Sequence, residues 1–151
     1  MNIRVATTIN APTEQVWAAV SDIEHGSQRL SGIVTLSVLE KPESGLIGLK
    51  WSETRVMFGQ EATETMTITD AEEGRQYTTR AESHGSVYLT KMEVTELSGG
   101  QTNLAIVFDA KPQSAFAWVV SLLMAPLITG STTKALRRDL DDIRRSVESG
   151  H

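Results

Sequence analysis

The sequence predicts an α+β domain in which about seven antiparallel strands form one sheet that a long C-terminal helix covers. Three observations support this prediction. Residues 33–110 alternate between apolar and polar side chains in short segments that turn signals separate. Pairing these segments as hairpins keeps their apolar side chains on one face of the sheet. The alternation stops at two places, where apolar residues follow the three-and-four spacing of a helix.

Seven segments have the period-two pattern of a strand that is buried on one side only. Short glycine-containing loops, at residues 42–45, 58–59, 71–74, 84–85 and 98–100, join most of them as hairpins. The strands are expected at Asn2 to Asn10, Ile33 to Lys41, Ile47 to Met57, Gln60 to Asp70, Arg75 to Ser83, Ser86 to Leu97 and Gln101 to Ala110.

The loop lengths also predict which side chains lie opposite one another, because hairpin partners must point to the same face of the sheet. The predicted pairs continue one apolar face across every hairpin. They are Leu36 with Trp51, Val38 with Leu49, Trp51 with Met66, Leu49 with Ile68, Ile68 with Tyr77, Tyr77 with Met92, Ala81 with Tyr88, Met92 with Ile106 and Val94 with Leu104.

Two short helices are expected between the first two strands. Pro12 suits the first turn of a helix, and the apolar residues that follow it share one stripe. A second short helix is expected to start near Ser21-Asp22 and to end by Gly32. The apolar stripe of the first helix consists of Val16, Trp17 and Val20.

The C-terminal region has the pattern of one long helix over residues 113–148. Pro126 and Gly130 are expected to kink or split it, because proline removes a helical hydrogen bond. The apolar face of its second half consists of Leu136, Leu140, Ile143 and Val147.

Composition limits the classes of protein to which the chain can belong. With 151 residues, 40% hydrophobic and 22% charged, residues 1–151 have the size and balance of one soluble globular domain. The chain has no cysteine, which excludes disulfides, thiolate metal sites and a cysteine nucleophile and favours a reducing, cytoplasmic setting. A net charge of −5 offers no positive field for a phosphate backbone, so nucleic acid is not an expected partner.

One charged group interrupts the apolar face. The register that pairs Trp51 with Met66 also places Glu53 opposite Glu64 and Arg55 diagonal to Glu64. Two carboxylates near one guanidinium could raise the pKa of one acid while the guanidinium anchors a ligand carboxylate or carbonyl. The alternatives are a structural ion pair at the wet mouth of the sheet, or a slipped register that turns all three side chains to solvent.

Other kinds of site have no support in the sequence. The three histidines, His25, His84 and His151, are scattered, so neither a metal-ligand spacing nor a serine, histidine and acid arrangement is evident. The glycines occur at turns, and no glycine-rich phosphate loop opens a helix. We therefore expect no metal and no cofactor.

Three stretches of the chain carry motifs. They are residues 9–17 (INAPTEQVW) with Ser21-Asp22, residues 51–64 with WSETR, FG and EATE, and residues 139–143 (DLDDI). These motifs resemble those of the START-like or Bet v 1-like (SRPBCC) superfamily, in particular bacterial proteins of the polyketide cyclase/dehydrase type. The resemblance covers essentially the whole chain. It implies a helix-grip fold, in which a curved antiparallel sheet wraps around the C-terminal helix and leaves an apolar cavity between them.

The predicted inner face supplies the lining of such a cavity. Aromatic side chains and methionine suit an apolar ligand because they offer large, adaptable contact area. Ordinary core packing is the alternative for any one of them. The ligand-binding candidates are Trp51, Glu53, Arg55, Glu64, Met66, Tyr77, Tyr88, Met92, Ile106, Phe108, Phe116, Val120 and Met124.

Three functions remain open. The preferred one, which the resemblance implies, is binding or transport of a small hydrophobic ligand such as a lipid, a quinone or a polyketide-like molecule. The second is a cyclase or dehydratase, with Glu64 as base, Tyr88 or Tyr77 as proton donor and Arg55 as substrate anchor. The third is a protein-interaction module, as in the co-chaperone relatives of the superfamily.

The first half of the C-terminal helix is apolar on nearly every side, although a helix over a sheet needs only one apolar stripe. Intramolecular packing, a homodimer partner or a membrane surface could cover the outer side of residues 116–124. The apolar stretch at residues 115–128 is shorter than the roughly 20 residues that cross a bilayer, so stable membrane insertion is not expected. A lack of nearby Lys or Arg argues against strong binding to anionic lipid.

Overall fold

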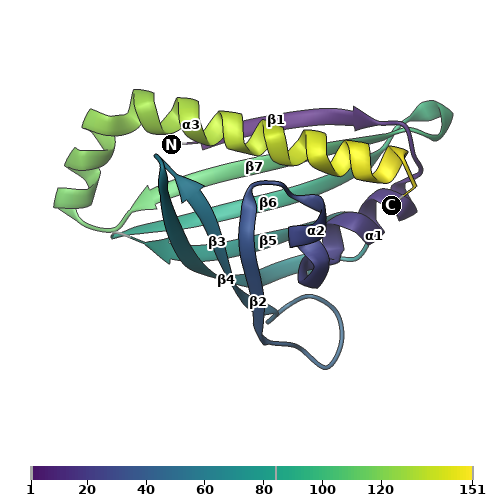
Figure 1. Ribbon diagram of the computed structural model, residues 1–151, viewed down its shortest axis with the longest axis horizontal. Helices are drawn as coiled ribbons and strands as arrows, with labels where there is room; N and C mark the ends of the chain where they lie inside the picture. The colour runs from purple at the N-terminus through teal and green to yellow at the C-terminus, as the bar shows by residue number, and fades with distance from the viewer. Residues whose placement is uncertain (1, 84, 151) are drawn as a thin grey trace.

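The strands form one curved antiparallel sheet in the computed structural model, which describes residues 2–83 and 85–150 (Figure 1). The described part of the sheet has seven strands in the order β1-β7-β6-β5-β4-β3-β2, so every hairpin pairs neighbours in sequence and β1 closes against β7. The strands are β1 (Asn2–Ile9), β2 (Ile33–Glu40), β3 (Lys50–Met57), β4 (Gln60–Glu72), β5 (Gln76–Ser83), β6 (Ser86–Glu96) and β7 (Thr102–Pro112). The predicted fold class is confirmed, while His84 and His151 lie outside the described residues.

The helices also lie where the sequence places them. Pro12 is the N-cap of α1 and has extended backbone, so its fixed φ leads directly into the first turn. Ser114 caps the long C-terminal helix, because its Oγ accepts a hydrogen bond of 3.0 Å from the backbone N–H of Ala117. The helical elements are α1 (Thr13–Ser21), the 3₁₀ turn η1 (Ile23–His25), α2 (Gly26–Arg29), the 3₁₀ turn η2 (Ser98–Gly100) and α3 (Ala115–Glu148).

The register of most hairpins is as predicted. Trp51 lies opposite Met66, and Ala81 lies opposite Tyr88. The Ile68 backbone N–H donates to the Leu49 carbonyl over 2.9 Å, so these two residues are paired although Leu49 directly precedes the first residue of β3. The remaining confirmed pairs are Tyr77 with Met92, Met92 with Ile106 and Val94 with Leu104.

Two predicted registers are wrong. In the first hairpin Trp51 lies opposite Val38 rather than Leu36, because β3 begins only at Lys50 and the loop before it is longer than residues 42–45. The shift is by two residues, so the apolar side chains still share one face. In the hairpin of β4 and β5, the register shifts between Ile68 and Asp70, so Ile68 lies opposite Thr79 instead of Tyr77. An extra residue at such a bulge bends the strand and increases its twist.

The core lies between the inner face of the sheet, α1 and the second half of α3. Trp17 of α1 packs edge-on against Tyr77, with 6.1 Å between their ring centres. From α3, the predicted apolar face contributes Leu140, Ile143 and Val147, all buried. This part of α3 is therefore held on the sheet over its whole length.

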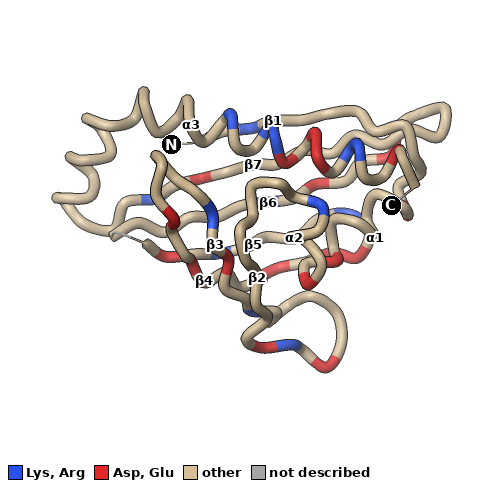
Figure 2. Tube along the Cα trace, in the orientation of Figure 1, with Lys and Arg blue, Asp and Glu red and all other residues tan. Residues whose placement is uncertain are grey.

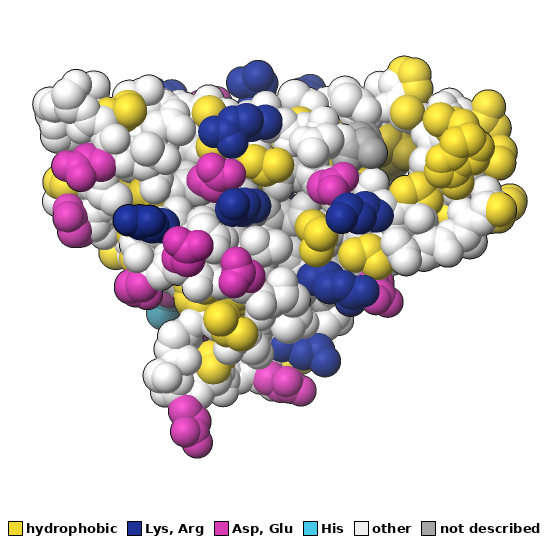
Figure 3. Space-filling view, turned by 180° about the vertical axis from the view of Figure 1, so that it is seen from behind, with side chains coloured by type: hydrophobic (Ala, Val, Ile, Leu, Met, Phe, Trp, Pro, Cys, Tyr) yellow, Lys and Arg dark blue, Asp and Glu magenta, His cyan; other side chains and the backbone are white. Residues whose placement is uncertain are grey.

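The first half of α3 is not held in this way. It leaves the end of β7, stands beyond the end of the sheet and bends before it meets the second half (Figure 1). The helix is continuous through Pro126, so the proline bends it without splitting it. We call residues 115–128 the apolar arm. Its hydrophobic side chains gather at one end of the molecular surface (Figure 3).

Candidate functional site

The predicted lining residues of the strands lie in rows across the inner face. One row runs Trp51, Met66, Ala81, Tyr88 and Ala110 from β3 to β7. The next runs through Ile68, Thr79, Thr90 and Phe108, and a further one contains Tyr77, Met92 and Ile106. The small side chains of Thr79, Ala81 and Thr90 were not among the candidates, because sequence reasoning searched for large residues.

These rows differ in burial. The row near α1 is filled: Tyr77 and Ile106 are buried, and the Tyr77 hydroxyl donates to the Val20 carbonyl over 2.8 Å. Burial, reinforced by the charges of Glu53 and Asp139, raises the pKa of Tyr77, so it remains protonated and structural. Met92 is partly buried against this core.

Toward the arm, side chains of the inner face are only partly covered. We call this the open patch; it consists of Glu64, Met66, Tyr88, Thr90 and Phe108. The rings of Tyr88 and Phe108 are stacked, with 5.8 Å between centres and 24° between planes. A stacked pair on an apolar surface offers a flat platform to which a planar apolar molecule could add a further ring.

Glu64 provides the charge of the open patch. It lies opposite Glu53 in the ladder, as predicted, and its side chain is partly buried. Burial raises the pKa of Tyr88, and the negative charge of Glu64 raises it further, against a hydrogen bond with Ser86 that lowers it. Tyr88 is therefore a hydroxyl donor at neutral pH, with a carboxylate close enough to influence it.

Replacing Glu64 with glutamine is expected to lower the pKa of Tyr88 toward its ordinary value near 10, because one of the two causes of its elevation is removed. The measurement is an ultraviolet titration of the phenolate in a Tyr77→Phe background, which leaves one of the two tyrosines. Glu96→Gln, on the exposed end of the same strand as Tyr88, is the control and should leave the midpoint unchanged. An unchanged midpoint in Glu64→Gln would contradict the coupling.

A second charged group joins β3 to α3. Arg55 Nε donates to Glu53 over 2.7 Å, and its two terminal nitrogens contact both oxygens of Asp139 at 3.1 and 3.0 Å. Trp51 Nε1 donates to the other Glu53 oxygen over 3.1 Å. The carboxylate side chains of Glu53 and Asp139 are 9% and 10% exposed, so the group is almost dry. We call Glu53, Arg55 and Asp139 the ionic latch.

Burial and charge–charge attraction oppose each other in the ionic latch. Burial alone would lower the pKa of Arg55, but Asp139 and Glu53 more than offset this and raise it. Burial raises the pKa of Asp139, although Arg55 opposes that effect. Because its nitrogens contact two carboxylates, Arg55 fits the role of a structural ion pair better than that of a ligand anchor. Asp139 was not among the predicted site residues. It lies three residues after Leu136 and four before Ile143, so helical spacing places this carboxylate on the apolar stripe of the helix, and that position could have indicated a buried charge.

The three helical candidates lie apart from the strand candidates. Phe116, Val120 and Met124 are 80%, 39% and 41% exposed, respectively. They were predicted to face the sheet, but the arm that carries them stands beyond its end (Figure 1). Their side chains are therefore largely open to solvent.

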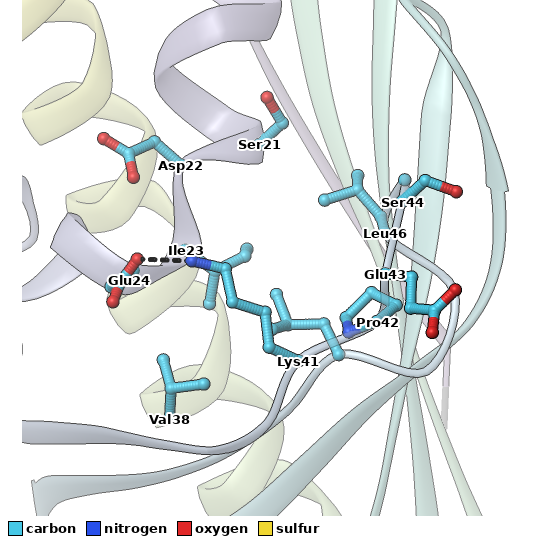
Figure 4. A pocket seen from close by; sticks show the side chains of 12 residues that line it. Ser21, Asp22, Ile23, Glu24, Val38, Lys41, Pro42, Glu43, Ser44 and Leu46 are labelled. Carbon is cyan, nitrogen blue, oxygen red and sulfur yellow. Dashed lines mark hydrogen bonds and ion pairs between the residues drawn. The ribbon is translucent and has the colours of Figure 1, made fainter.

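Hollows in the surface lie elsewhere. One of about 300 Å³ lies between residues 21–24 and the loop at residues 41–46, where Lys41 contacts Glu24 over 3.1 Å (Figure 4). Another, of about 470 Å³, lies between α1 and the end of α3 and contains Arg29 and Asp22. Neither includes a predicted lining residue. The cavity that the resemblance implies between the sheet and the C-terminal helix therefore remains a prediction.

The chain has a curved seven-stranded sheet that packs around a C-terminal helix, and two short helical segments follow the first strand. This arrangement is the helix-grip fold of START-like and Bet v 1-like proteins. Sequence comparison agrees. The chain belongs to the family described as polyketide cyclase / dehydrase and lipid transport, whose model matches residues 1–148. No curated protein matches the chain in sequence.

Solved structures show the same fold at low sequence identity. The protein TTHA0849 from Thermus thermophilus has a TM-score of 0.81 at 14% identity, covering 99% of this chain and 98% of its own. A START superfamily protein from Mycobacterium smegmatis has a TM-score of 0.81 at 16% identity, covering 98% and 97%. The Zhui aromatase/cyclase from a Streptomyces species has a TM-score of 0.81 at 14% identity, covering 98% and 93%.

Proposed function

We propose that the chain binds a small hydrophobic ligand at the open patch, as a binding or carrier protein of a reducing, cytoplasmic compartment. The observation that carries the proposal is the stacked pair of Tyr88 and Phe108, which is only partly covered although it lies on the apolar face of the sheet. Leaving such surface in water is unfavourable, so a ligand that covers it gains free energy in proportion to the area buried. The family description, which includes lipid transport, supports this proposal.

The patch also restricts the chemistry of the ligand. Aromatic faces favour a planar ring system, and Met66, two strands from Tyr88 in the same row, adds an adaptable apolar side chain. Glu64 accepts a hydrogen bond from a ligand hydroxyl, while Tyr88 donates one to a carbonyl. A hydroxylated polycyclic ketone or quinone combines these features better than a plain acyl chain does.

A second candidate function is a cyclase or dehydratase at the same patch. The observation that favours it is the electrostatic coupling of Glu64 with Tyr88, an acid–phenol pair beside an apolar surface. In this role Tyr88 protonates a substrate carbonyl and Glu64 removes a proton from carbon. Turnover of the bound ligand by the wild type distinguishes the two functions: an enzyme converts the ligand and Glu64→Gln abolishes that turnover, whereas a carrier releases the ligand unchanged.

The first test is native mass spectrometry of the gently purified chain, followed by solvent extraction. A co-purifying apolar molecule supports binding and identifies the ligand class. Binding is then measured by quenching of tryptophan fluorescence with a hydroxylated anthraquinone as probe. Absence of both a co-purifying molecule and probe binding would overturn the proposal.

A variant that fills the patch is expected to weaken probe binding by about tenfold or more, the equivalent of about 1.4 kcal/mol. Thr90 lies on the inner face next to Phe108, so Thr90→Phe places a ring where the ligand would lie. Thr95→Phe is the matched control, because Thr95 is an exposed threonine of the same strand that points to the other face. Equal binding by both variants would place the ligand elsewhere.

A further inference from the structure

We propose that the apolar arm of α3 docks on the surface of a phospholipid bilayer that contains anionic headgroups. Eight large hydrophobic side chains of the arm are exposed, including Phe116 at 80%, Leu123 at 77% and Leu122 at 58%. The most apolar 18-residue stretch of α3 has a mean hydropathy of 1.6, and only 6% of it is buried. This surface is independent of the open patch and of the ligand proposed for it.

The angular spread of these side chains distinguishes a bilayer from a flat protein partner. At about 100° per residue, the eight exposed side chains cover about 240° of the helix circumference. Only the narrow side that contains Ala117 turns toward the body of the protein. A second helix or sheet face covers a stripe of roughly 100°, whereas lipid can surround the arm on every exposed side.

The charges next to the arm match an anionic surface. The sequence has no Asp, Glu, Lys or Arg from residue 112 to residue 133, and the first charged residues that follow are Lys134, Arg137 and Arg138 (Figure 2). All three are exposed. Phe116, Leu123, Leu127 and Lys134 follow one another at spacings of seven, four and seven residues. Lys134 therefore continues the helical stripe of these apolar side chains. The arm and its immediate flanks lack basic residues, as expected, and the helix places the first ones one to three turns beyond the arm.

The attachment of the arm determines how it meets the bilayer. Its first turn lies against the β5–β6 turn, where the Gln113 backbone N–H donates to the Gly85 carbonyl over 2.8 Å. Beyond the arm, the ionic latch and Leu140 hold α3 on the sheet. Both ends of the arm therefore stay on one side of the membrane. By length and composition α3 could cross a bilayer, but these two attachments to the sheet keep the arm in the interface.

The test is flotation of the full chain with vesicles of phosphatidylcholine alone or mixed with phosphatidylglycerol. The wild type is expected to float with the anionic vesicles and to bind about tenfold less to the neutral ones. Leu123→Glu is expected to reduce binding to anionic vesicles by about tenfold or more. Ile47→Glu is the matched control, because Ile47 is 55% exposed in the loop between β2 and β3, and should change binding less than twofold.

Two further readouts report on the arm itself. Trp118 is 56% exposed whereas Trp17 and Trp51 are buried, so vesicles should shift the tryptophan emission to shorter wavelength, and Trp118→Tyr should lose that shift. Neutralising Lys134 and Arg137 to glutamine should abolish the preference for anionic over neutral vesicles.

Several outcomes would overturn the proposal. One is a wild type that does not float with anionic vesicles at low salt, and another is a Leu123→Glu variant that floats as well as the wild type. Light scattering provides the third. If the chain is a stable dimer that Leu123→Glu dissociates, and neither form binds vesicles, the arm is an interface between two copies.

Discussion

Replacing Arg55 with alanine is expected to lower the free energy of unfolding by about 3–5 kcal/mol at neutral pH. The substitution removes the guanidinium that Glu53 and Asp139 share, and their side chains are only 9% and 10% exposed. Arg138 is then the remaining cation that acts on Asp139. Urea denaturation followed by circular dichroism measures the change. Because the ionic latch joins β3 to the second half of α3, losing Arg55 should also weaken the packing of the helix on the sheet.

Two sets of variants test this reasoning. Arg80→Ala removes another Arg–Glu pair, but Arg80 and Glu82 are 43% and 62% exposed, so the expected loss is below about 1 kcal/mol. Combining Arg55→Ala with Glu53→Gln and Asp139→Asn removes the unpaired charges and should restore part of the lost stability. If Arg55→Ala costs no more than Arg80→Ala, the latch does not stabilise the fold.

Leu140→Ala is expected to lower the free energy of unfolding by about 2–5 kcal/mol. Leu140 is 2% exposed and is among the most deeply buried side chains of the protein. Shortening it removes apolar contacts from the interface between α3 and the sheet and leaves a cavity that the rigid strands can fill only in part.

The same substitution elsewhere on α3 provides the control. Leu123 belongs to the same helix and is 77% exposed, so Leu123→Ala should change stability by less than about 0.5 kcal/mol. Both variants are measured by urea denaturation under identical conditions. A loss of similar size at both positions would mean that the arm is packed in solution and does not project from the fold.

Local rules were sufficient to predict most of the sheet. The two-residue loop at 58–59 allows one pairing that keeps Trp51 and Met66 on a common face, and the structure has this pairing. The shift between Ile68 and Asp70 was beyond such rules. A bulge conserves the alternation on either side of it, so its position depends on how the whole sheet curves.

The candidate site was predicted less completely. Glu53, Arg55 and Glu64 were expected on the inner face, and the ladder places Glu53 opposite Glu64. The partner that engages Arg55 across the core is Asp139, which lies 84 residues further along the chain. Spacing along one element could not reveal that contact, because it depends on where α3 crosses the sheet.

By itself, then, the sequence determined the α+β class with one antiparallel sheet, the strand faces and the apolar composition of the arm, since these depend on periodicity, turn residues and hydrophobicity. The helix-grip architecture was implied by the family resemblance. Only the tertiary structure decided that Arg55 holds Asp139, that Tyr88 and Phe108 stay partly open, and that Phe116 and Leu123 face solvent. The physical reason is the same for all three. Each depends on the path of α3, and the bend at Pro126 and the contacts of its second half direct that path through the sum of many long-range contacts.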